Sequence, residues 1–336
     1  MNSNYYEEVC VVMKKLYDYQ KDETVSLYLL IKSAEEKKTR NNKPYLALTF
    51  QDTSGEISAN FWDAKPKDIE TFKAGYVVKV DGRREEYNGN PQLRINNIRL
   101  AKEDEPSNPE LYVERAPINK DKMIEEFNKA MFDITNANLN RIVRHVMKKF
   151  QREFFQSPAA MRNHHAFLGG LAYHTVCMLR IARSLLEVYE GLNMSLLFSG
   201  IILHDVGKVI ELSGPTATEY TLEGKLVGHI VLITNEITKA CQELKIDETH
   251  EDVLLLKHLI LAHHGEYEYG SPVRPQIPEA EVIHYIDQID AKMNMMEAAL
   301  RKTEPGEFSE KIWAMGNRSF YKNTLNSVKD SNEKEK

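Results

Sequence analysis

The hydrophobic period of this chain changes from that of strands to that of helices near residue 103, and this change constrains the fold more than any other feature. Residues 24–100 alternate between apolar and polar side chains, and period two is typical of strands. From Asn119 to residue 328 the apolar residues recur at helical spacing, so we expect helices and no strand there. A chain of 336 residues predicts about two domains. The sequence therefore predicts a multidomain β + α protein, with a β domain followed by an all-α domain.

The front segment has the strand order of a small barrel. Three alternating stretches precede a short helical piece, Pro66 to Phe72, and two further stretches are joined by the hairpin signal Tyr87-Asn88-Gly89-Asn90. In the first stretch, Val25, Leu27, Leu29 and Ile31 alternate with Ser26, Tyr28, Leu30 and Lys32. This order is that of a five-stranded OB barrel. The stretches TFQDTSGEISANFWD and GNPQLRI resemble OB-folds that bind nucleic acid.

These patterns divide the chain into five segments. Residues 1–20 are an N-terminal extension with helical spacing in 4–17, which indicates a packing or docking helix. Residues 21–102 form the OB domain, and residues 103–118, which contain three prolines, form a linker. Residues 119–328 form the all-α domain. The last segment, residues 329–336, is a charged tail that we expect to be disordered.

One face of the predicted barrel has the side chains that single-stranded nucleic acid needs. If the apolar residues of the second and third strands point inward, Tyr45 and Trp62 point outward, near Arg94 of the last strand. Aromatic rings there would stack on bases and the guanidinium would meet phosphates. Alternatively, the two rings cover a domain interface. Lys38 and Arg40 lie in the loop between strands one and two, where OB-folds commonly touch ligand, although a charged loop is also often only solvated.

In the helical part, an apolar run ends in adjacent His204 and Asp205, followed by Gly207 and Lys208. Neighbours on a helix point about 100° apart, so such a pair suits one metal ion better than one packing face. Gly207 permits a backbone break, and Lys208 then lies where a phosphate could meet it. Imidazoles and carboxylates suit Mn, Fe, Zn or Ni, and a shared carboxylate can bridge two ions. Further candidates in helical-looking segments are His174, His229, His263, His264, Asp287 and Asp290.

The order of these residues resembles the two-metal variant of the HD-domain superfamily of metal-dependent phosphohydrolases, over roughly residues 160 to 300. The resemblance implies one ion on His174, His204, Asp205 and Asp287, and a second on Asp205, His229, His263 and His264, with Asp205 bridging. It implies catalytic roles for Asp205 and Lys208, the latter stabilising charge on the phosphate. We prefer Asp287 as the last carboxylate ligand, with Asp290 as the alternate or as a supporting residue. His165, in the loop before His174, either reaches the nucleic acid or supports the ligands.

The whole arrangement resembles the YhaM-type 3′→5′ exoribonucleases of Gram-positive bacteria, apart from the first dozen residues and the tail. The resemblance implies a hydrolase, a two-metal phosphodiesterase with two Mn²⁺ ions (Fe, Ni, Co or Mg as alternatives). It implies release of nucleotides from the 3′ end of single-stranded RNA, with single-stranded DNA as a further substrate. Two alternatives are an HD phosphohydrolase of nucleotides or other small phosphate esters, whose OB domain serves assembly, and a non-catalytic RNA-binding protein. The complete ligand set argues against the last.

Composition limits the cellular location and the kind of nucleic-acid binding that we expect. The sequence contains no run of eighteen apolar residues, and the first twenty residues lack a long apolar core, so we expect neither a membrane span nor a secretion signal. Three separated cysteines without a CxxC pair predict a reducing, cytoplasmic location. The net charge of −6 argues against a general nucleic-acid coat protein, yet residues 21–102 hold 15 Lys and Arg against 12 Asp and Glu. A homo-oligomer is compatible with the sequence.

Overall fold

The computed structural model describes residues 14–325, except 88, 161–164, 166 and 217. It divides into two compact units, which meet in the sequence between Glu114 and Arg115. The expected helix within residues 4–17 falls almost wholly outside the described residues, as does the charged tail 329–336. Of the former, only a short 3-10 turn, Leu16–Asp18, is described.

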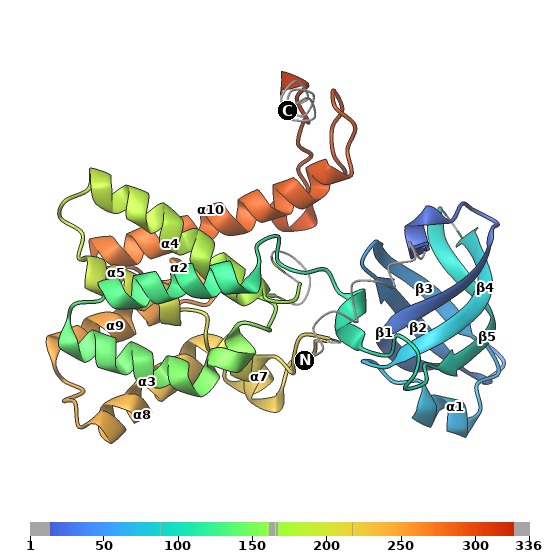
Figure 1. Cartoon of the computed structure of the whole chain (residues 1–336), viewed down its shortest axis with the longest axis horizontal. Helices are drawn as coiled ribbons and strands as arrows, with labels where there is room; N and C mark the ends of the chain where they lie inside the picture. Colours follow the sequence, from blue (N-terminus) through green and yellow to red (C-terminus); the bar gives the residue numbers. More distant parts are fainter. Residues whose placement is uncertain (1–13, 88, 161–164, 166, 217, 326–336) are drawn as a thin grey trace, which may run out of the picture. The chain divides into compact units, whose positions relative to one another are not determined.

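The first unit is a closed five-stranded barrel with the strand order β1-β2-β3-β5-β4 (Figure 1). The pairing of β3 with β5 is parallel and the other pairings are antiparallel. An α-helix lies between the third and fourth strands in the sequence, as an OB barrel requires. The predicted fold of this part is therefore confirmed. Its elements are β1 (Thr24–Lys38), β2 (Pro44–Asp52), β3 (Gly55–Phe61), α1 (Pro66–Thr71), β4 (Val77–Tyr87), β5 (Asn90–Leu100) and the 3-10 turn Pro109–Tyr112.

The barrel interior is built from the alternating apolar side chains, including Leu29, Leu46 and Phe50. The alternation predicts Leu30 on the polar side of β1, and this prediction is wrong, because Leu30 is also fully buried. At this residue β1 is paired with both β4 and β2, and its register with β2 shifts just beyond, between Ile31 and Ser33. A strand that bends at such an irregularity no longer follows a simple period of two.

The segment before β1 is part of this unit. Leu16 is fully buried within the barrel core, and its backbone N–H donates to Asp52 Oδ2 at 2.6 Å. Tyr17 donates its hydroxyl hydrogen to the carbonyl oxygen of Glu56. Residues 14–20 therefore contribute to the barrel.

The second unit is helical and has its own apolar core. Every residue of helix α5 after Met194 is buried, because these residues are apolar or small on every side, and α2, α3, α4, α9 and α10 contact the helix. Among the described residues, no helix has the length and apolar content that a bilayer span requires. The helices are α2 (Lys120–Asp133), α3 (Ala137–Phe154), α4 (Gly170–Val188), α5 (Met194–Leu203), α6 (Lys208–Glu211), α7 (Leu222–Leu226), α8 (His229–Leu244), α9 (Glu251–Ala262) and α10 (Pro278–Arg301).

The end of this unit differs from the expectation of helices up to residue 328. Helix α10 ends at Arg301, and residues 302–325 form turns with two antiparallel bridges, Phe308 with Tyr321 and Ile312 with Arg318. Pro305-Gly306 and Gly316-Asn317 are turn signals that outweigh the apolar spacing, since Gly306, Gly316 and Asn317 adopt positive φ. The bridges are isolated pairs, so the unit remains a helical domain.

Candidate metal centre

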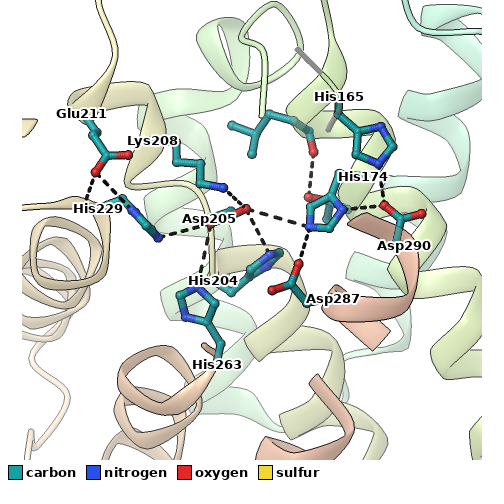
Figure 2. A network of polar contacts seen from close by, with 12 residues as sticks. His165, His174, His204, Asp205, Lys208, Glu211, His229, His263, Asp287 and Asp290 are labelled. Carbon is teal, nitrogen blue, oxygen red and sulfur yellow. Dashed lines mark hydrogen bonds and ion pairs between the residues drawn. The ribbon is translucent and has the colours of Figure 1, made fainter. Parts of the chain in front are cut away.

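The ends of several helices converge on Asp205, in the turn that follows the buried helix α5 (Figure 2). His204 immediately precedes it, His229 is the first residue of α8, and His263 directly follows α9. His174 and Asp287 approach from α4 and α10. A buried helix of fixed position thus places two ligands, and its neighbours supply the others.

The two carboxylate oxygens of Asp205 face two different sets of imidazoles. Oδ2 lies 3.3 Å from His204 Nε2 and 3.9 Å from His174 Nε2, whereas Oδ1 lies 3.5 Å from His229 Nε2 and 3.9 Å from His263 Nε2. Within each of two sets of residues, the possible ligand atoms lie within 4.8 Å of one another. We call His174, His204 and Asp205 the first group, and His229, His263 and His264 the second group. The structure therefore brings the sequence-predicted ligands close together, with Asp205 between the two groups of imidazoles.

In each of the five imidazoles of the two groups, Nδ1 forms a hydrogen bond within the protein. His204 and His263 donate Nδ1–H to the carbonyl oxygens of Ile201 and Ile260, each at 2.7 Å. His264 donates in the same way to the carbonyl oxygen of Tyr269. The remaining two rings have carboxylate partners: His174 Nδ1 lies 2.6 Å from Asp290 Oδ2, and His229 Nδ1 lies 3.2 Å from Glu211 Oε1. An Nδ1–H held in this way leaves the lone pair of Nε2 for a cation.

The atoms that face the centre fit a metal site. Nε2 of His204, His229 and His263 and Oδ1 of Asp205 are buried and have no hydrogen-bond partner among the described residues. Buried polar atoms without a partner are costly, so such a cluster requires an explanation. Divalent cations bound here would satisfy these atoms, and nitrogen with carboxylate oxygen is a donor set that transition metals accept.

Burial and charge set the protonation of these groups in opposite directions. Burial, with the nearby rings of His264 and His204, holds the pKa of His263 well below its usual value, so this ring is neutral. Burial also opposes the charge on Asp205, but Lys208 and His204 hold its pKa well below the usual range. Burial lowers the pKa of His174, while hydrogen bonds to Asp287 and Asp290 outweigh this and raise it to about 10. A cation would therefore displace a proton from His174.

The structure separates the roles of the two carboxylates on α10. Asp287 Oδ1 lies 3.3 Å from His174 Nε2, the nitrogen that faces the centre. Asp290 instead contacts Nδ1 of the same ring, on the side away from the centre (Figure 2). This geometry favours Asp287 as the ligand and Asp290 as the residue that supports His174.

His165 does not fit the proposed contact with nucleic acid. Its side chain is buried, and Nε2 lies 2.6 Å from Asp290 Oδ2. A ring enclosed in this way has no surface for a strand, so the other interpretation, support of the ligands, agrees with the structure.

Lys208 and Gly207 follow Asp205 in the same turn. Lys208 Nζ donates to Asp205 Oδ2 at 2.7 Å, so its ammonium group lies beside the carboxylate that faces both groups. Burial lowers the pKa of Lys208, but the charge of Asp205 outweighs it and raises the pKa. Gly207 has φ −57° and ψ −22°, which any residue can adopt. A backbone break is therefore not why glycine is needed: a Cβ here would overlap the carbonyl oxygen of His229.

We predict that Gly207→Ala separates the two ligand segments. The added methyl group would push against the backbone of His229, and overpacking of this kind costs about 1–3 kcal/mol. For a domain of this size the melting temperature should fall by about 2–12 °C. Calorimetry measures this, and Gly191→Ala is the control, since a Cβ at Gly191 meets nothing within 4 Å. Equal melting temperatures for both variants would contradict the close approach.

Sequence reasoning missed Glu211. Its Oε1 accepts from the backbone N–H of His229 at 3.1 Å and lies 3.2 Å from Nδ1 of that ring. The two residues are 18 positions apart and come together only through the packing of α6 against α8, so no local pattern reveals the pair.

The proposed nucleic-acid residues lie on the first unit. Tyr45 lies in β2 and Trp62 directly follows β3; their ring centroids are 4.7 Å apart, and Trp62 is 56 % exposed. Lys38, Arg40 and Arg94 are also exposed, and Arg94 forms an ion pair of 3.6 Å with Glu85. The barrel thus presents an aromatic pair and several cations to solvent.

Fold and site together define a helical metal-binding domain that follows an OB barrel. The family model of the HD domain matches residues 171–292, which include His174, the residues around Asp205 and helix α10 up to Lys292. The family model of the OB-fold nucleic acid binding domain matches residues 29–101. The two matches support a metal-dependent phosphohydrolase that acts on nucleic acid.

Proposed function

We propose that this protein is a 3′→5′ exoribonuclease that hydrolyses single-stranded RNA with two Mn²⁺ ions. The observation that carries the two-ion site is Asp205, whose two oxygens face separate groups of imidazoles. The first group together with Asp287 would hold one ion, and the second group together with Asp205 would hold the other. Bound there, the ions supply an activated water and offset charge on the phosphate oxygens.

The residues of the chain perform the remaining tasks. The hydrogen bonds at Nδ1 keep each imidazole oriented, so the site needs little rearrangement before reaction. Lys208, beside Asp205, is a point charge that would neutralise a phosphate oxygen. The pair formed by the half-buried Tyr45 and the exposed Trp62 supports a polymeric substrate over a mononucleotide, because neighbouring aromatic rings suit the stacking of successive bases of one strand.

A time course on single-stranded RNA labelled at its 5′ end, with Mn²⁺ present, tests the proposal. We expect a ladder of labelled products that shortens gradually from the unlabelled end. Immediate release of a labelled mononucleotide would indicate the opposite polarity, and one internal cut would indicate an endonuclease. If the RNA stays intact while nucleotides or small phosphate esters are hydrolysed, the protein is instead a small-molecule phosphohydrolase.

We predict that Trp62→Ala weakens binding of single-stranded RNA by about 1–3 kcal/mol, the usual worth of a base stacked on an aromatic ring. The affinity is measured by fluorescence anisotropy with a labelled oligonucleotide at fixed salt. Tyr76→Ala is the control, since Tyr76 is an exposed aromatic residue in the turn before β4. Unchanged affinity for the Trp62 variant would assign this ring to a protein interface.

A further inference from the structure

Asp290 is built into the fold as the partner of a single metal-facing ring. Its Oδ2 lies 2.6 Å from His174 Nδ1, while Asp287, one turn earlier on α10, approaches Nε2 of the same ring. Helix α10 therefore contacts both nitrogens of His174. The position of Asp290 is itself fixed, because His165 Nε2 lies 2.6 Å from the same oxygen. His165 is held in turn by Asn294, one turn further along α10, whose Oδ1 accepts from its backbone N–H at 2.9 Å.

Glu211 has the same relation to a ring of the second group. Its Oε1 receives both the backbone N–H and Nδ1–H of His229, at 3.1 and 3.2 Å. Both side chains are largely buried. The carboxylate is held at the end of α6, where its own carbonyl oxygen accepts from the backbone N–H of Thr221 at 2.9 Å.

The other three rings have backbone partners at Nδ1 instead of carboxylates. His204, His263 and His264 donate Nδ1–H to backbone carbonyl oxygens, which no side-chain substitution removes. Each of the two groups thus contains one ring with a carboxylate behind it, His174 in the first and His229 in the second. A carboxylate there fixes the tautomer and orientation of the ring and strengthens Nε2 as a ligand, and its loss typically weakens metal binding 10- to 100-fold.

We propose that Asp290 and Glu211 are positioning residues, each of which strengthens one ion site and not the other. This inference rests on the two-ion site proposed above. It assigns Asp290, through His174, to the ion of the first group, and Glu211, through His229, to the ion of the second group. Neither carboxylate is assigned as a ligand. The affinities of the two sites can therefore be changed separately by substitutions outside the ligand set.

The test uses the full chain, stripped of metal and titrated with Mn²⁺, with free Mn²⁺ measured by electron paramagnetic resonance. Two backgrounds isolate the sites: His264→Ala removes a ligand of the second group, and His204→Ala removes one of the first. In the His264→Ala background, Asp290→Asn should weaken the remaining site about 10- to 100-fold, and Glu211→Gln should leave it within about threefold. In the His204→Ala background the two effects should be exchanged.

The substitutions to Asn and Gln keep the side-chain volume, so a failure to fold is not expected to obscure the result. Glu279→Gln is the matched control: Glu279 is a buried carboxylate on α10 that accepts from the backbone N–H of Asn193. It should leave both affinities unchanged. If Asp290→Asn and Glu211→Gln weaken both sites alike, or neither, the assignment is overturned. If the unsubstituted chain binds no Mn²⁺, the proposed function itself fails, which is a different result.

Discussion

Replacement of Asp205 by alanine is expected to lower the rate of RNA hydrolysis by about a thousandfold or more. The reason is geometric: Asp205 is the residue whose two oxygens face both groups of imidazoles, so its loss affects both ion sites. Metal ions contribute several kcal/mol to phosphoryl transfer, and each 1.4 kcal/mol corresponds to about tenfold in rate. Single-turnover kinetics with saturating enzyme measure the chemical step.

Binding of single-stranded RNA should be largely retained by this variant, because the aromatic pair lies on the other unit. The matched control is Glu236→Ala, which removes a buried carboxylate of α8 whose partners are Lys149 and Lys239. We expect this control to hydrolyse RNA at close to the unsubstituted rate. Full activity of Asp205→Ala would be incompatible with the two-ion site.

Removal of divalent ions by a chelator is expected to stop hydrolysis completely, and added Mn²⁺ should restore it. In the proposed mechanism the imidazole and carboxylate cluster holds the ions that activate the water, so hydrolysis should depend on them. The same experiment has a readout in stability. At a Mn²⁺ concentration one hundred times the dissociation constant, a bound ion adds about 2.7 kcal/mol to the free energy of unfolding. For the helical unit this corresponds to a rise of about 5–10 °C in melting temperature.

The control for this experiment is RNA binding measured in the presence of the chelator. Binding should persist, because the described residues of the barrel contain no group of side chains that could hold a metal ion. Hydrolysis that continues after exhaustive chelation would exclude the proposed mechanism. Restoration of activity without a rise in melting temperature would place the ions outside the buried cluster.

The sequence predicted the parts of this protein that depend on periodicity and residue type. Alternation in β2 and β3 predicts which side chains form the barrel interior, and Phe50 and Ile57 are buried as expected. The imidazoles and carboxylates could be identified because few other uses explain adjacent pairs such as His204-Asp205 at a helix end. Only the fold brings these residues close together around Asp205.

The features that sequence reasoning missed all depend on tertiary packing. Leu30 is buried because β1 changes partners at that residue, which a strict alternation does not anticipate. Glu211 and His229 meet across 18 positions, and glycine is required at 207 by the neighbouring backbone rather than by its own dihedral angles. The sequence left two interpretations of His165 open because the burial of this ring depends on α10, which lies more than a hundred residues later.

The apolar interiors of the barrel and of the helical unit share no residue in the part of the chain that the structure describes. Each interior is therefore free to melt at its own temperature, and heating need not be an all-or-none event for the whole chain. At a temperature between the two transitions only one unit would be folded. The protein would then either bind single-stranded RNA without hydrolysing it, or keep its metal centre without the RNA-binding barrel.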